Sequence, residues 1–215
     1  MDVLQSVLAS LLCITLHELS HGYVAFLLGD TTARDAGRLT LNPLKHLDIF
    51  GLLMMVVAHV GWAKPVPVNM YRFKNPRRDM AVTALAGPVT NILISIVAFF
   101  LYGVMLVPAV VNGLGVAVFF ADFFQLTAII SLGYAVFNFI PIPPLDGSKV
   151  VFSLFGDRAY EFLMRYERYG FILLYLLVFT NRLNGILQTG ISFLAGKFYL
   201  FAVWGADLAS LLLRL

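Results

Sequence analysis

The chain has 215 residues, of which 60% are hydrophobic and only 13% are charged. This composition excludes an ordinary water-soluble domain, because apolar runs that reach the ~20 residues needed to cross a hydrocarbon core recur along the chain. The pattern predicts an all-α polytopic membrane protein with a single domain over residues 1–215, made of a core in 1–150 and additional membrane helices in 157–215. The net charge of +3 could indicate an acidic partner, but the positions of the basic residues along the chain make nucleic-acid binding the weaker interpretation.

The distribution of the basic residues indicates how the chain is oriented. Twelve of the fifteen Lys and Arg residues lie in residues 34–45, 64–78 and 149–168. Cytoplasmic loops carry an excess of Lys and Arg, so all three stretches are expected on the cytoplasmic side. We therefore expect a multi-pass protein of the plasma membrane whose basic loops face the cytoplasm.

The first apolar run, residues 3–28, predicts a retained transmembrane helix. It lacks the basic start of a signal peptide and contains three ionisable residues, which a signal peptide does not need. Gly29 and Asp30 supply the stop signal. The single cysteine, Cys13, lies inside this run, which rules out an intrachain disulfide and a cysteine-based zinc site.

The residues after the first helix predict less regular structure. Residues 37–48 alternate apolar and polar side chains, which favours a short edge strand, and Asn42 with Pro43 begins a turn. The apolar run 49–62 is too short for a full span and predicts a re-entrant or half-buried segment. The region after the first helix is therefore expected to be a short β-hairpin or re-entrant region. Residues 64–79 contain three prolines and are expected to form a cytoplasmic loop.

The remaining apolar runs predict four further spans. Prolines at 141, 143 and 144 end the span 116–139, and an amphipathic stretch over 157–168 precedes the span 169–180. The total is five spans, or six at most. The four runs are residues 80–107, 116–139, 169–180 and 186–213.

The motif HELSH, His17 to His21, is the strongest chemical signal in the chain. Positions i and i+4 share one face of a helix, so both imidazoles can bind one zinc ion while Glu18 points at its open position. The alternative is that these are merely satisfied polar groups in a helix bundle. That alternative leaves three costly ionisable groups inside a membrane helix, whereas one metal ion would offset the cost of all three.

A catalytic zinc ion takes a third protein ligand and keeps one position for water. The long metzincin extension is excluded because Val24 and Leu27 stand where that motif needs Gly and His. Asp146 is the better candidate for the third ligand, because it directly follows prolines that break an apolar span. The backbone groups that lose their hydrogen bonds there must be shielded by protein or water. If the first helix runs inward, His17 lies roughly 22 Å along it, and the inward span 116–139 delivers Asp146 to a similar depth.

HELSH, ALAGPVTN (residues 84–91) and NFIPIPPLDG (residues 138–147) occur in the order and spacing of the site-2 protease family, which this chain resembles over about residues 15–147. The resemblance implies an intramembrane zinc metalloprotease with one Zn²⁺ per chain. It implies His17, His21 and Asp146 as ligands and Glu18 as the general base. From the basic loops, the active site is expected to open towards the cytoplasm. The implied partners are a transmembrane protein substrate and the lipid bilayer.

Three asparagines are secondary candidates. The resemblance gives Asn138 a role in orienting substrate or stabilising an oxyanion, with helix packing as the alternative. Asn91 and Asn42 are either structural residues or substrate contacts; Asn91 follows Gly87-Pro88, which lets helices approach closely. The rival to proteolysis is a metal-binding membrane transporter, or a family member without catalytic activity, that uses the same ligands. The sequence does not predict the substrate or the oligomeric state.

Overall fold

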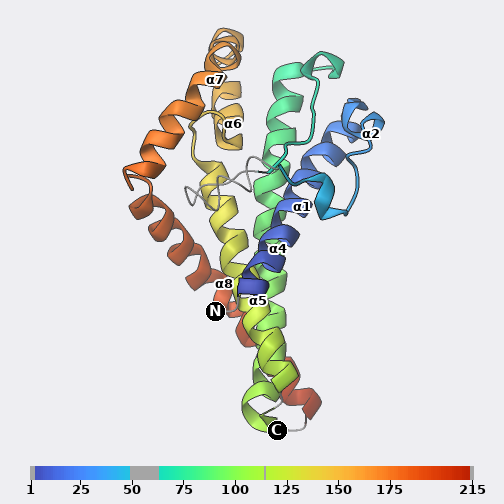
Figure 1. Cartoon of the computed structure of the whole chain (residues 1–215), viewed down its shortest axis with the longest axis vertical. Coiled ribbons are helices and arrows are strands. Elements are labelled where there is room, and N and C mark those ends of the chain that lie inside the picture. Colours follow the sequence, from blue (N-terminus) through green and yellow to red (C-terminus); the bar gives the residue numbers. More distant parts are fainter. Residues whose placement is uncertain (1–2, 49–62, 114, 214–215) are drawn as a thin grey trace. The chain divides into compact units, whose positions relative to one another are not determined.

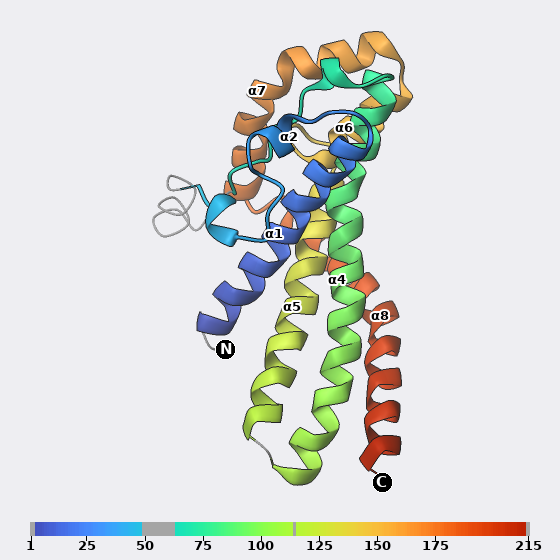
Figure 2. The same cartoon turned by 90° about the vertical axis from the view of Figure 1, so that its right-hand side faces the viewer.

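The computed structural model describes residues 3–48, 63–113 and 115–213 (Figures 1 and 2), so the predicted re-entrant segment 49–62 lies outside the described residues. The described residues form helices joined by short connections. The α-helices are α1 (Val3–Leu27), α2 (Thr32–Asp35), α4 (Pro76–Asn112), α5 (Gly115–Phe139), α6 (Asp146–Leu154), α7 (Asp157–Phe179) and α8 (Asn184–Leu213), and two 3-10 helices are η1 (Pro43–Lys45) and η2 (Met70–Arg72).

Four of the described helices, α1, α4, α5 and α8, are long and apolar enough to cross a membrane. The predicted total of five or six spans is therefore not confirmed. The predicted span 169–180 is the second half of α7, whose first half carries Asp, Glu and Arg side chains. Its uncharged part is about half the length of a hydrocarbon core, which explains the difference.

Glycines and prolines set the ends of these helices. After α1, Gly29 has φ +107°, a backbone conformation that favours glycine, and the Asp30 N–H bonds back to Ala25 O at 2.9 Å. Helix α4 continues through Pro108, beyond the end of the predicted span 80–107, and the chain reverses at Gly113 with φ +61°. Helix α5 ends at Phe139, just before the prolines.

The predicted edge strand and β-hairpin are not confirmed, because the described residues 37–42 form a turn, bends and irregular backbone. Gly37 has φ +64°, and Asn42 caps η1 by accepting a hydrogen bond from the Leu44 N–H at 3.0 Å. These local bonds compete with a strand ladder. Only one antiparallel bridge, between Leu47 and Ala63, pairs the described backbone around this region.

The described chain divides into two compact units. The first comprises Met1–Cys13, Asn91–Phe137 and Asn181–Leu215. Its core lies where α4, α5 and α8 run side by side (Figure 2). Small residues dominate this core and let the helices approach closely; it consists of Ala98, Phe99, Ala128, Leu132 and Ala202.

The second unit comprises Ile14–Thr90 and Asn138–Thr180. Its core joins the end of α1, the beginning of α4 and the charged half of α7. This unit contains HELSH, Gly87 and Asp146 together. The core residues are Ala25, Phe73, Met80, Tyr160 and Leu163.

Candidate metal centre

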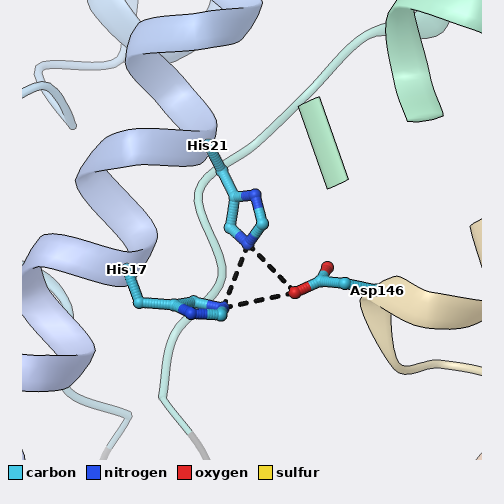
Figure 3. A group of neighbouring side chains, drawn as sticks. All are labelled: His17, His21 and Asp146. Atoms are coloured by element: carbon cyan, nitrogen blue, oxygen red, sulfur yellow. Dashed lines mark hydrogen bonds and ion pairs between the residues drawn. The ribbon is translucent and has the colours of Figure 1, made fainter. Parts of the chain in front are cut away.

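Three predicted ligands lie together inside the second unit (Figure 3). His17 and His21 project from successive turns of α1, and Asp146 is the first residue of α6. The Nε2 atoms of the two histidines are 3.0 Å apart. Asp146 Oδ2 lies 3.3 Å from His17 Nε2 and 3.2 Å from His21 Nε2. The two motifs therefore meet at a nearly equilateral triangle of potential ligand atoms.

The size of this triangle fits a tetrahedral zinc ion. With zinc–ligand distances of ~2.0–2.1 Å, tetrahedral geometry places ligand atoms ~3.3 Å from one another. The observed separations of 3.0–3.3 Å match three corners of such a tetrahedron. Among the residues that the structure describes, no other group of three His, Cys, Asp or Glu side chains has comparable geometry.

The site is buried and electrostatically suited to a cation. His17 and His21 are only 7% and 9% exposed. Burial raises the pKa of the Asp146 carboxyl, but the nearby His21 and His17 rings outweigh that effect and hold the pKa below its usual value. Asp146 is therefore ionised at neutral pH, as a metal-binding carboxylate must be.

A backbone carbonyl of α4 orients one of the two imidazoles. His21 Nδ1 lies 2.7 Å from Thr83 O. Because a carbonyl can only accept, Nδ1 must carry a proton, so Nε2 is the His21 nitrogen that is available to a metal ion. Hydrogen bonds of this kind commonly fix the tautomer of metal-binding histidines. This role could not be predicted from the sequence, since any residue at position 83 supplies a carbonyl.

Gly87 leaves the space that the two imidazole rings occupy. A Cβ atom added at Gly87 would lie 2.5 Å from His17 Cε1 and 2.6 Å from its Nε2, and it would also meet His21 Nε2. Real Cβ atoms essentially never approach other atoms so closely. The sequence suggested only that Gly87-Pro88 allows close helix approach; the structure identifies the histidine rings as what approaches.

We expect Gly87→Ala to weaken zinc binding by at least about tenfold, because both imidazoles must move. Alanine is the better helix former by ~1 kcal/mol, so the helix itself should not suffer. Equilibrium dialysis against buffered zinc, followed by elemental analysis, measures the effect. Gly196→Ala in α8 is the matched control, since the described residues place no atom outside its own stretch of helix within 4 Å of the added Cβ. Equal zinc affinity of the two variants would contradict the steric argument.

Glu18 lies between the two histidines in sequence but is not one of the three converging groups. Its side chain is half-buried, and its Oε2 accepts a hydrogen bond of 2.8 Å from the Val66 N–H. The predicted general base thus forms a hydrogen bond with the backbone of a segment that lies 48 residues away in sequence. The sequence did not reveal this contact.

The asparagine candidates are placed differently. Asn42 is exposed and caps η1, a local structural role. Asn91 is fully buried, and its backbone carbonyl accepts a hydrogen bond of 2.8 Å from Ser131 Oγ within the first unit. Asn138 is half-buried and belongs to the same unit as the three converging groups. A contact with substrate stays a prediction for all three asparagines.

Comparisons with known proteins are consistent with this centre. The profile of the family described as "Peptidase family M50" matches residues 107–179, which include Asp146. Three relatives share the name "Putative zinc metalloprotease". YwhC of Bacillus subtilis is 41% identical over 180 residues, which is 81% of this chain and 80% of the relative. No solved structure matches the chain.

The other two relatives are longer than the part that aligns. Rip2 of Mycolicibacterium smegmatis is 30% identical over 81% of this chain, which spans 66% of that protein's length. MJ0611 of Methanocaldococcus jannaschii is 29% identical over 48% of this chain and 49% of its own length. The similarity thus extends across bacterial and archaeal proteins that carry the same description.

Proposed function

Because the chain belongs to peptidase family M50, the site-2 protease family, we propose that it is a zinc-dependent endopeptidase that cleaves transmembrane segments of other membrane proteins. The observation that carries this proposal is the triangle of His17, His21 and Asp146 with Glu18 beside it. One Zn²⁺ per chain would be held by the two imidazole Nε2 atoms and the Asp146 carboxylate, a set of three ligands that leaves the fourth position open.

The position of the centre supports cleavage within the bilayer. His17 lies about 21 Å along α1 at 1.5 Å per residue, inside a helix that is long and apolar enough to cross a membrane. Peptide bonds of a membrane-spanning substrate are the bonds within reach at that depth. The basic residues of the connecting segments favour a plasma-membrane protein whose centre opens to the cytoplasm.

The chemistry divides between the metal and the chain. Zinc would supply Lewis acidity, which activates a water molecule and polarises the scissile carbonyl. Glu18 accepts a proton from the attacking water as the water oxygen bonds to the carbonyl carbon. When the C–N bond breaks, Glu18 donates that proton to the leaving nitrogen. A helical substrate must first unwind locally, because its carbonyls are otherwise engaged in backbone hydrogen bonds.

Metal removal tests the proposal. The purified protein in liposomes, together with a single-span peptide, should lose all cleavage when a chelator removes its zinc and regain it when one equivalent per chain returns. Mass spectrometry of the products locates the cut, which should fall within the apolar segment. Zinc flux into the same liposomes distinguishes the rival function, since a transporter would carry zinc and leave the peptide intact.

A further inference from the structure

The residues 63–69, AKPVPVN, form a connection that runs from the bridge at Ala63 to η2 and lies against α1. Prolines at 65 and 67 restrict Lys64 and Val66 to extended backbone conformations. They also remove two N–H groups, so between Lys64 and Pro67 only Lys64 and Val66 can donate. Both of these donors are engaged.

Three further hydrogen bonds anchor this 63–69 segment on either side of Val66. The Lys64 N–H donates to His46 O at 2.9 Å, and Arg38 Nη2 donates to Lys64 O at 2.8 Å. At the other end, the Asn69 N–H donates to Asp30 Oδ2 at 2.6 Å. Arg38 and Asp30 are themselves buried, so these contacts are shielded from water.

Val66 lies on the face of α1 that carries Glu18 and Gly22, one turn apart. The Val66 N–H contacts Glu18 Oε2, and a Cβ added at Gly22 would lie 2.9 Å from Val66 Cγ1. The absence of a side chain at Gly22 thus lets the segment approach α1 closely. Val66 is only 7% exposed, which shields its hydrogen bond to Glu18.

We propose that the main-chain N–H of Val66 is a positioning group for Glu18, and that the anchored 63–69 segment holds the general base in place. The hydrogen bond occupies Oε2 and leaves Oε1 to exchange the proton with water and the leaving nitrogen. Because a carboxylate on a two-carbon stem has several rotamers, fixing one oxygen reduces the orientations that it can adopt. This inference rests on the proposed proteolytic function.

Val66→Pro removes the donor in a backbone that is already extended. We expect it to lower kcat by about 10- to 100-fold, because a displaced catalytic group loses alignment. The bound zinc should stay at one per chain and KM within about twofold, since neither the ligands nor substrate binding changes. Val66→Ala keeps the N–H and loses only the side chain, so its kcat should lie well above that of Val66→Pro. Equal kcat values for the two variants would overturn the proposal.

A proline ring could also push the 63–69 segment away from α1. A second variant carries an ester at residue 66, made by incorporating the α-hydroxy acid of valine, which replaces only the N–H with oxygen. It should show the same loss of kcat with normal zinc content. An ester variant with wild-type kcat would refute the role of this hydrogen bond even if the proline variant failed to fold.

Amide hydrogen exchange tests the contact independently of catalysis. The Val66 N–H should be protected in the wild-type protein and lose that protection in Glu18→Ala, while the Lys64 N–H stays protected. Unchanged protection of Val66 would show that the contact does not form. If the contact forms but the wild-type protein cleaves nothing, the proposed function fails, and the role of Val66 in it fails too.

Discussion

Asp146→Ala should release zinc from the purified protein and abolish cleavage. Asp146 supplies one of three ligand atoms, 3.2–3.3 Å from both histidine nitrogens, and alanine offers none. Even the loss of an outer-shell partner costs about 10- to 100-fold in metal affinity or activity, so the loss of a ligand should cost at least about 100-fold in affinity. Elemental analysis after dialysis against buffered zinc, and peptide cleavage in liposomes, measure the two effects.

Asp157→Ala is the matched control for this experiment. Like Asp146, Asp157 is the first residue of its helix. Its carboxylate is exposed and pairs with Arg77 at 2.9 Å, and it is not one of the three converging groups. The control should keep its zinc and its activity. If Asp146→Ala bound zinc as tightly as the control, the assignment of the third ligand would be wrong.

Glu18→Gln should keep one zinc per chain and lose cleavage by about 10²- to 10⁴-fold, the usual contribution of a general acid–base group. Glutamine has nearly the same shape, and its side-chain oxygen can still accept the Val66 N–H, so the fold and the metal ligands should be unaffected. The amide cannot take a proton from water at neutral pH. Turnover of a single-span peptide and metal content, measured on the same preparation, give the result.

The outcome for Glu18→Gln also separates a protease from the rival functions. A transporter that uses the same three ligands has no need of a base at position 18 and would keep its zinc flux. Glu161→Gln in the charged half of α7 controls for the loss of a carboxylate outside the site. A Glu18→Gln protein that cleaved as well as this control would remove Glu18 from the mechanism.

Local sequence patterns were sufficient to predict the long apolar helices and the metal-binding motif of this protein. Helix geometry places residues i and i+4 on one face, so HELSH predicted a pair of imidazoles before any fold was known. Long apolar runs predicted α1, α4, α5 and α8, because the hydrocarbon core sets a minimum length. Asp146 could also be predicted from the sequence, because it follows prolines that break an apolar span, where backbone groups without hydrogen bonds must be shielded from lipid.

The failures of prediction arose where a short pattern was ambiguous. Residues 37–42 alternate like a strand, but side-chain capping by Asn42 and the left-handed conformation at Gly37 favour turns. The apolar run 169–180 resembled a short span, yet it continues a helix whose first half is charged. In both cases local bonding or the residues next to the segment outweighed the pattern within it.

Only the tertiary structure decided what surrounds the ligands. Thr83 O lies 62 residues from His21 in sequence, and the Val66 N–H lies 48 residues from Glu18. Both contacts use backbone atoms, a carbonyl oxygen that every residue has and an N–H that every residue except proline has. The side chains at positions 66 and 83 therefore do not predict these contacts. The space at Gly87 likewise exists only because another helix brings its imidazoles there. Sequence thus specified the reactive groups, and packing specified their orientation.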